Sequence, residues 1–266
     1  GEKGVSISFL TENGRFLARV AGPVSGNVLL RRAQFRLSED ETFSAKLSRV
    51  MVAAKIANAR TVLQRCLRYH EQSEGRAAVE AAVARLGYIV PTLKEEISCD
   101  KIRGAEGGAG HMYFSVFDHL IVAQKNDFSF KERTRRPPLD NVNALLSFVY
   151  TLLAHDAVAA CEAVGLDPQM GFLHRDRPGR ASLALDLMEE LRPFLADRLV
   201  LSLINRQQVE GKGFKKTETG AVNMDDATRK TVLKAYQERK QEPLKHPFLE
   251  DEMPVALILH VQARLL

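Results

Sequence analysis

The chain has 266 residues, of which 45% are hydrophobic and 27% are charged. These proportions are ordinary for a folded globular protein of one large domain and exclude a largely disordered chain. The longest nearly continuous apolar run, 144–154, is too short to span a membrane, so no membrane partner is expected. Lys and Arg outnumber Asp and Glu by 38 to 33, giving a net charge of +5, and this excess suits a polyanionic partner such as nucleic acid.

The three cysteines, Cys66, Cys99 and Cys161, are far apart in the sequence. They form no closely spaced pair, which argues against a zinc cluster or a disulfide framework. Free thiols favour a reducing compartment, so a cytoplasmic location is expected.

Two strands are predicted at the start of the chain, at 5–10 and 15–20. They flank Asn13-Gly14, and Asn-Gly supplies the positive φ values of a tight hairpin turn. Residues 21–29 are rich in turn formers and are predicted to be a linker. Residues 30–266 then form the main domain.

Helices dominate that domain, which makes the predicted fold class mainly α. A long helix is expected from Ser38, a good N-cap residue, because apolar residues recur at helical spacing as far as Val62. Further helical patterns cover 73–86, 100–121, 140–163, 182–199, 226–241 and 255–264. The 140–163 segment is apolar almost all round, which is typical of a buried central helix, and Asp140 is expected to cap its start.

Small residues surround one carboxylate, Glu106, in the segment 104–109. Each glycine costs a helix about 1 kcal/mol relative to alanine. That cost favours a place where a metal, a phosphate or another backbone must approach closely. The alternative is a frayed helix start with a solvated glutamate.

A second candidate is His174, which stands in a loop with Arg175, Arg177 and Arg180. Histidine is the commonest side-chain metal ligand and arginine is a natural phosphate partner. An ordinary loop histidine is the alternative interpretation.

A third candidate is the acidic set Asp186, Glu189 and Glu190. These residues are three and four positions apart, so they share one region of a helix surface. A solvated acidic face is the alternative, although several leucines surround the acids and indicate that part of this face is buried.

Basic residues form two further regions. Arg135 and Arg136 close a segment that also contains Lys125, Lys131 and Arg133, with Phe128 and Phe130 between them. Arginine pairs bidentately with phosphate, whereas the alternative is a plain solvated loop. The second region runs from Arg206 to Lys240 and includes an amphipathic helix that could equally be an exposed surface.

Taken in order, these pieces resemble the CRISPR-associated adaptation integrases, which insert new spacers into CRISPR arrays. The stretches that carry the resemblance are 103–107, 135–140 with 143–148, 171–174 and 182–193, supported by the hairpin 8–15 and by Phe214 and 219–222.

The resemblance implies a helical catalytic bundle at 30–266, preceded at 1–20 by a remnant of a β domain that the chain otherwise lacks. It implies a Mg²⁺ or Mn²⁺ site with Glu106, His174 and Glu189 as catalytic ligands and Asp186 as a supporting carboxylate, although the residues alone do not distinguish Glu189 from Glu190. It also implies DNA-backbone contacts from Arg135, Arg136, Arg175, Arg177 and Arg180.

The expected partners are double-stranded and branched DNA, a second copy of the chain and the second-numbered Cas protein. Two other functions fit the same residues. One is a non-catalytic DNA-binding scaffold, and the other is a helical nuclease unrelated to spacer capture.

Overall fold

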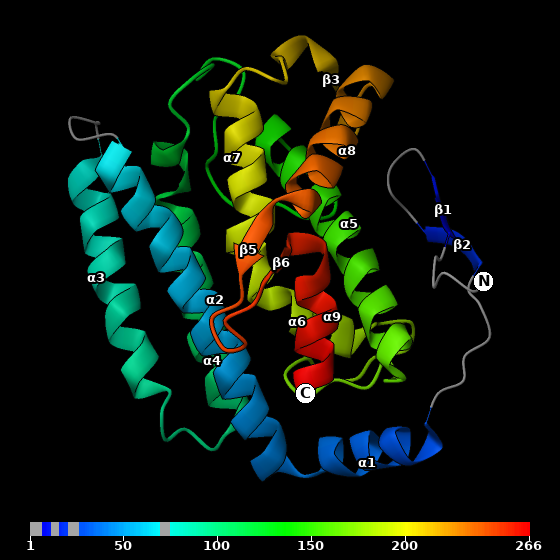
Figure 1. Ribbon diagram of the computed structural model, residues 1–266. Helices are drawn as coiled ribbons and strands as arrows, with labels where there is room; N and C mark the ends of the chain where they lie inside the picture. The colour runs from blue at the N-terminus through cyan, green and yellow to red at the C-terminus, as the bar shows by residue number, and fades with distance from the viewer. Residues whose placement is uncertain (1–6, 12–15, 21–26, 70–74) are drawn as a thin grey trace.

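The fold is mainly helical, as predicted. The computed structural model describes residues 7–11, 16–20, 27–69 and 75–266. In Figure 1, helices α2, α3 and α4 stand side by side on one side of the molecule, and α5 to α9 form the other side. The candidate site residues lie where these two groups meet.

The N-terminal hairpin is confirmed as a pair of antiparallel strands, β1 (Ile7–Leu10) and β2 (Phe16–Val20). The pairing is irregular between Phe9 and Leu10. The predicted Asn13-Gly14 turn and most of the predicted linker lie outside the described residues.

Helix α1 (Val28–Glu39) begins within the segment assigned to the linker, and Asn27 caps it by accepting a hydrogen bond from the backbone N–H of Leu29. The expectation that Ser38 caps the long helix is wrong. Ser38 lies inside α1, and Asp40 caps α2 (Glu41–Tyr69) by accepting from the N–H groups of Thr42 and Phe43. An aspartate carboxylate fills the capping role that a serine hydroxyl was expected to fill.

Helix α3 (Arg76–Thr92) packs against α2 and α4 (Cys99–Ser115), and α4 leads into the short 3₁₀ helix η1 (Phe117–Leu120). Glu106 is in the middle of α4, so the frayed helix start is excluded. Ser98 caps α4 by accepting from the N–H of Lys101.

Helix α5 (Asn141–Val164) is the buried central helix that the sequence predicts. Asp140 caps it by accepting from the N–H of Asn143 at 2.7 Å, as expected. By length and composition α5 could cross a membrane, but 56% of its apolar window is buried inside the protein, where it packs against α6 and α9. Its apolar surface is therefore explained by the core of the bundle.

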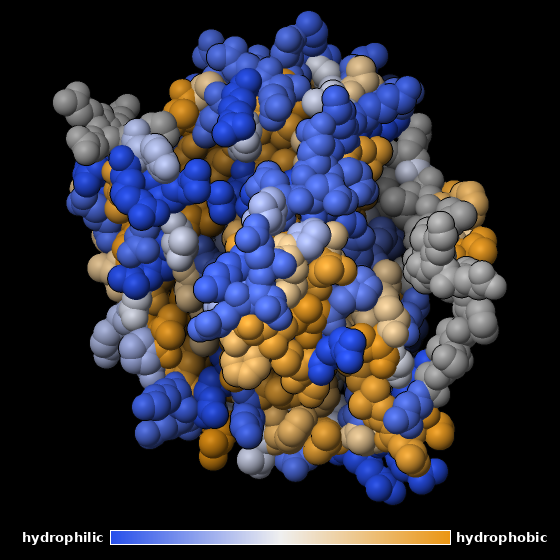
Figure 2. Space-filling model, in the orientation of Figure 1, coloured by the Kyte–Doolittle hydropathy of each residue, from blue (hydrophilic) through white to orange (hydrophobic). Residues whose placement is uncertain are grey.

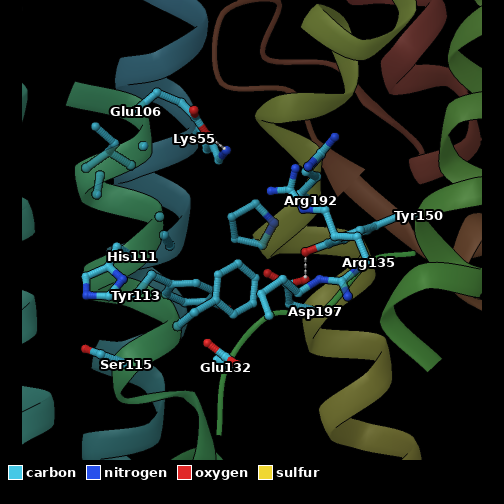
Figure 3. Close-up of a pocket in the computed structure, with 18 of the residues that line it drawn as sticks. Lys55, Glu106, His111, Tyr113, Ser115, Glu132, Arg135, Tyr150, Arg192 and Asp197 are labelled. Carbon is cyan, nitrogen blue, oxygen red and sulfur yellow. Dashed lines mark hydrogen bonds and ion pairs between the residues drawn. The ribbon is translucent and has the colours of Figure 1, made fainter. Parts of the chain in front are cut away.

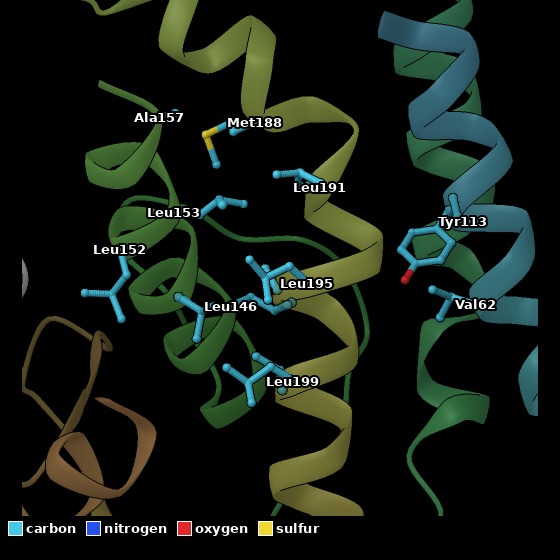
Figure 4. Packing of buried hydrophobic residues seen from close by; sticks show 14 of the residues in the cluster. Val62, Tyr113, Leu146, Leu152, Leu153, Ala157, Met188, Leu191, Leu195 and Leu199 are labelled. Atoms are coloured by element: carbon cyan, nitrogen blue, oxygen red, sulfur yellow. The ribbon is translucent and has the colours of Figure 1, made fainter. Parts of the chain in front are cut away.

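The predicted helix 182–199 is divided into three segments. They are α6 (Ser182–Glu189), the π-helical turn η2 (Arg192–Asp197) and α7 (Arg198–Asn205). Pro193 has no N–H to donate to the preceding turn, which interrupts the regular hydrogen-bond ladder at this point. Figure 4 shows Met188, Leu191, Leu195 and Leu199 along this side of the core, with Leu146 and Leu153 of α5 nearby.

The C-terminal part contains 3₁₀ helix η3 (Gly211–Gly213), a hairpin of β3 (Phe214–Lys216) and β4 (Val222–Met224), helix α8 (Asp226–Gln241), a hairpin of β5 (Pro243–Lys245) and β6 (Glu252–Pro254), and helix α9 (Val255–Leu265). Figure 2 shows hydrophilic side chains over α8 and hydrophobic ones over α9 near the C-terminus. Both helices pack on α5 and complete the bundle.

Candidate active site

Lys55 of α2 lies between two carboxylates that are far apart in the sequence. Its ammonium forms ion pairs with Glu106 Oε1 of α4 and, at 2.5 Å, with Glu189 Oε2 of α6. Figure 3 shows Lys55 and Glu106 pointing toward each other at one end of a pocket. The ion pairs therefore join three helices at one cluster of side chains.

His174 reaches the same cluster and is held there by Asp186. Its Nδ1 atom is 2.6 Å from Asp186 Oδ1, and its Nε2 atom is 3.8 Å from Glu189 Oε1. A hydrogen bond between Nδ1 and a carboxylate fixes the orientation of the ring and turns Nε2 to its other side. Glu189 thus connects the other two predicted ligands, since it shares Lys55 with Glu106 and lies 3.8 Å from Nε2 of His174.

Asp186 is fully buried and organises the loop that carries His174. Its two oxygens accept hydrogen bonds from the backbone N–H groups of Phe172, Leu173 and His174, at 2.7 to 3.0 Å. A Cβ atom on Gly171 would lie only 2.8 Å from Asp186 Oδ2. Glycine is therefore required at 171 for this carboxylate to approach the loop.

Two further contacts brace the same region. Arg103 of α4 donates to the backbone oxygen of Leu173 at 2.8 Å. Gln34 of α1 is buried and donates to the backbone oxygens of Asp167 and Met170, both at 2.8 Å. The His174 loop is therefore fixed from two sides.

The electrostatics distinguish Glu189 from Glu190. Burial alone would raise the pKa of Glu189, but Arg192 and Lys55 outweigh it and lower the pKa to about 2. Arg192 lies 3.1 Å from Glu189 Oε1. Glu190 instead accepts a hydrogen bond from Gln262 of α9 at 2.6 Å, and burial raises its pKa. Glu189 is therefore the stronger acid of the two and the one that contacts the cluster.

A pocket of about 510 Å³ extends from Lys55 and Glu106. Gly107 and Gly110 of α4 line it, and nothing lies within 4 Å of where their Cβ atoms would be. The run of small residues thus leaves open space beside Glu106, large enough for a phosphate group to enter.

The far end of this pocket contains a second buried polar network. Tyr150 donates to Asp197 Oδ1 at 2.6 Å, and Arg133 and Arg192 lie 5.3 and 4.9 Å from the centre of the Tyr150 ring. Burial raises the pKa of Asp197 to about 6, against the hydrogen bond from Tyr150. Arg192 contacts both Glu189 and Tyr150 and so connects the two networks.

The five arginines predicted to contact DNA have different surroundings. Arg135 is exposed and lines the pocket, whereas Arg136 is exposed outside it. Arg175 pairs with Asp100 at 2.6 Å, Arg177 is exposed, and Arg180 is half-buried. Phe128 and Phe130, which lie between the basic residues in the sequence, are buried core residues and offer no stacking surface.

The donor set of this cluster fits a hard divalent cation. Two carboxylates and one imidazole are suitable ligands for Mg²⁺ or Mn²⁺, and the imidazole favours Mn²⁺. The carboxylates already share one cation, the Lys55 ammonium. In this arrangement no group of three or more His, Cys, Asp and Glu side chains, among the described residues, is spaced closely enough to hold an ion.

Lys55 is the residue that the sequence interpretation missed. Its neighbours Val52, Ile56 and Ala59 are buried, so Lys55 falls within an apolar stripe of α2 at three- and four-residue spacing. A lysine at such a position requires an anionic partner. The spacing of Lys55 among buried residues therefore indicates a buried lysine with an anionic partner. Arg192 lies in the same way between the buried residues Met188 and Leu195, so it too is expected to have an anionic partner.

Comparison with known proteins identifies the family. The sequence profile described as "CRISPR associated protein Cas1" matches residues 1–238. A protein named CRISPR-associated endonuclease Cas1 1 from Chlorobaculum tepidum is 53% identical over 99% of this chain and 77% of its own length. A second, CRISPR-associated endonuclease Cas1 2 from Rhodospirillum rubrum, is 52% identical with the same coverage.

Solved structures share the fold. A casposase bound to an integration product matches 99% of this chain and 70% of its own, with a TM-score of 0.84 and 25% identity. A CAS1 protein from Thermotoga maritima covers 99% of this chain and 78% of its own, with a TM-score of 0.80 and 22% identity. From sequence and fold together, the chain belongs to the CRISPR-associated Cas1 family.

Proposed function

We propose that this chain is a divalent-metal-dependent DNA integrase and endonuclease that inserts new spacers into a CRISPR array. The observation that carries the proposal is that Glu106 and Glu189 pair with one cation, Lys55, while His174 Nε2 lies 3.8 Å from Glu189. Family membership supports the nuclease class, and the likeness to a casposase bound to its integration product supports joining as well as cutting.

Glu106, His174 and Glu189 would hold the metal, with Asp186 fixing the tautomer and orientation of His174. A bound Mg²⁺ or Mn²⁺ would polarise the scissile phosphate and stabilise charge on the attacking and leaving oxygens. Arg135 lines the adjacent pocket and would bind a non-bridging phosphate oxygen. Arg192 helps to keep the pKa of Glu189 low, which favours the anionic form that a metal ion requires.

The reaction is a transesterification. The 3′-hydroxyl of the incoming DNA loses its proton and forms a new bond to a phosphorus of the target strand. The bond from that phosphorus to the 3′-oxygen of the target strand breaks, and this leaving oxygen takes up a proton. Bond energy is conserved, so no nucleotide cofactor is needed. Water in place of the 3′-hydroxyl gives cleavage.

The proposed substrates are double-stranded and branched DNA, and the proposed partners are a second copy of the chain and Cas2. These partners follow from the family alone. The arginines around the cluster would contact phosphates and so confer little sequence preference.

A strand-transfer assay tests the proposal. The chain is incubated with a labelled duplex that has a free 3′-hydroxyl and with a target duplex, in Mn²⁺ or in EDTA. The control duplex ends in a 3′-dideoxy nucleotide, which lacks the nucleophile. We expect a joined product only with Mn²⁺ and the free 3′-hydroxyl.

The other outcomes identify the alternatives. Cutting without joining would indicate a nuclease unrelated to spacer capture. Binding without either reaction, with Cas2 present and absent, would indicate a DNA-binding scaffold.

A further inference from the structure

Four glycines lie inside helix α4 around Glu106. They are Gly104, Gly107, Gly108 and Gly110. Glycine is the least favourable residue for a helix interior after proline, because it loses the most backbone freedom on folding. Among the described residues, no atom lies within 4 Å of the place where a Cβ atom would stand at any of the four. Alanine would therefore fit each position in the free protein and stabilise the helix.

Two of these glycines face the pocket beside Glu106 and two do not. Gly107 and Gly110 line the pocket, whereas Gly104 and Gly108 are exposed outside it. Around the helix axis, Gly110 and Gly107 are about 40° and 100° from Glu106, and the other two are both about 160° away. The missing side chains at 107 and 110 therefore leave the backbone of α4 open to the pocket.

The same pocket contains buried hydrogen-bond donors without acceptors. The hydroxyl of Tyr113, a residue that is 3% exposed, forms no hydrogen bond within the described part of the chain, and neither do the buried Nε atoms of Arg133 and Arg192. A buried donor without an acceptor is unfavourable. Three of them in one pocket indicate a ligand rich in oxygen acceptors, and the two guanidinium groups favour an anionic one.

The length of the pocket favours a strand over a single anion. Figure 3 shows Glu106, His111 and Tyr113 of α4 along one side of it. The lining residues of α4 extend from Glu106 to Ser115, a distance of about 13 Å along the helix axis. This is longer than one phosphate group. A nucleic-acid strand supplies both a succession of anionic oxygens and a continuous chain that packs against the helix.

We propose that Gly107 and Gly110 form a contact surface for DNA, on which the sugar–phosphate backbone of the strand that carries the scissile phosphate packs against α4. Tyr113 and Arg133 donate hydrogen bonds to phosphate oxygens of the same strand. The identity of the ligand as DNA rests on the proposed function. The openness of the surface and its contact with DNA are measured without metal, independently of the reaction.

The test compares four single variants that carry the same substitution on the same helix. Gly107→Ala and Gly110→Ala place a methyl group in the pocket, and Gly104→Ala and Gly108→Ala are the controls outside it. Melting temperature without DNA and affinity for a fluorescent branched DNA are measured in EDTA. Strand transfer and calorimetric Mn²⁺ binding are then measured with metal.

We expect all four variants to melt about 2 °C higher than the wild type, because alanine favours the helix at each position. Only the two pocket variants should bind DNA more weakly, and their strand transfer should be about 10- to 100-fold slower, since the methyl group displaces the strand from Glu106. Their Mn²⁺ affinity should equal that of the wild type. Gly107→Leu has a similar helix propensity but a larger side chain, so its strand transfer should be slower still.

Tyr113→Phe tests the unpaired hydroxyl. The variant should melt no lower than the wild type, because it removes a buried donor that has no acceptor in the free protein. Its affinity for the branched DNA in EDTA should fall about tenfold, as expected for the loss of a hydrogen bond to a charged group. Wild-type affinity would show that Tyr113 does not contact the strand.

Equal DNA affinity and equal strand transfer in the pocket and control variants would overturn the inference. A lower melting temperature of Gly107→Ala and Gly110→Ala would also overturn it, because the fold itself would then require these glycines. Both results would leave the proposed function intact if the wild-type chain still joins DNA. Conversely, a chain that neither cuts nor joins DNA, but whose DNA affinity falls only in the pocket variants, would retain this surface and reject the proposed reaction.

Discussion

The Nζ atom of Lys55 lies 2.5 Å from Oε2 of Glu189, a carboxylate that is almost completely buried. The same ammonium pairs with Glu106, so a protein cation lies between two of the three proposed metal ligands. Lys55 and a divalent ion would therefore compete for the same carboxylates.

This competition predicts the behaviour of Lys55→Met. Without the ammonium, Mn²⁺ should bind about tenfold more tightly or better, because a nearby positive charge has been removed. In EDTA the variant should be less stable by about 1–3 kcal/mol, since Glu189 loses a buried partner. Calorimetric titration with Mn²⁺ and thermal melting in EDTA measure the two effects. Lys46→Met, an exposed position on the same helix, is the control, and weaker Mn²⁺ binding by Lys55→Met would contradict the prediction.

The second prediction distinguishes Glu189 from its neighbour. Glu189→Gln should abolish cutting and strand transfer, because a neutral amide is a poor ligand for a divalent ion. Glu190→Gln should retain both activities, since Glu190 contacts Gln262 outside the cluster. Glu106→Ala and His174→Ala should behave as Glu189→Gln does, with DNA affinity largely unchanged. If Glu106→Ala, His174→Ala or Glu189→Gln keeps wild-type strand transfer in Mn²⁺, the residue altered in that variant is not a ligand.

A third prediction concerns the support of His174. Asp186→Asn replaces one of two acceptor oxygens by an amide NH₂ group, so the N–H groups of Phe172, Leu173 and His174 and the His174 ring can no longer all be satisfied. Mn²⁺ affinity should fall about 10- to 100-fold, as for other residues that orient a metal-binding histidine. Asp176→Asn, on the exposed part of the same loop, should bind Mn²⁺ as the wild type does. The prediction fails if the two variants bind Mn²⁺ equally.

A fourth prediction concerns Arg135 and Arg136. The double Arg135→Ala, Arg136→Ala variant should bind unrelated duplex sequences more weakly and to a similar extent, because phosphate contacts carry no base information. The slope of log affinity against log salt should fall by about 0.9 for each phosphate that the variant no longer neutralises. Weaker binding confined to one sequence would indicate base recognition instead.

The fifth prediction is a pH dependence of stability at Asp197. Its pKa is about 6 in the folded protein, above the ordinary value of 3.8, because the carboxyl is buried. A raised pKa means that the group contributes fully to stability below pH 3.8, and that this contribution is lost as the pH rises through 6. The free energy of unfolding of Asp197→Asn, compared with that of the wild type, should therefore increase by about 3 kcal/mol when the pH rises from 4 to 7.5. Denaturant unfolding at the two pH values measures the difference, and a constant difference would contradict it.

The sequence predicted the long helices because their apolar spacing is strong. Helix α5 is the clearest case, since it is apolar on nearly every side and begins at a capping aspartate. The interruption at η2 was not predicted, because leucines continue through Pro193 at helical spacing. Helix α1 was not predicted because its anchor is a polar residue, Gln34, and several of its apolar residues are exposed.

The candidate site was predictable only in part. Glu106, His174 and Glu189 were chosen through the family resemblance, whereas their spacing alone left Glu189 and Glu190 equivalent. Their meeting point depends on how α2 packs between α4 and α6, which is a tertiary contact that no local pattern encodes. The role of Lys55 is not evident from the sequence, because its two anionic partners come from α4 and α6 and are brought to it only by tertiary packing. The β3–β4 and β5–β6 hairpins have strands of three residues, too short for a periodic signal.

The proposed metal-binding cluster is assembled from residues at 55, 106, 174 and 189, and this spread has a consequence for biosynthesis. During translation the first two of these residues leave the ribosome long before the last two. Lys55 can pair with Glu106 as soon as α2 and α4 pack together, but the cluster stays incomplete until α6 has emerged and folded against them. The proposed metal site would therefore be complete only when most of the bundle has formed.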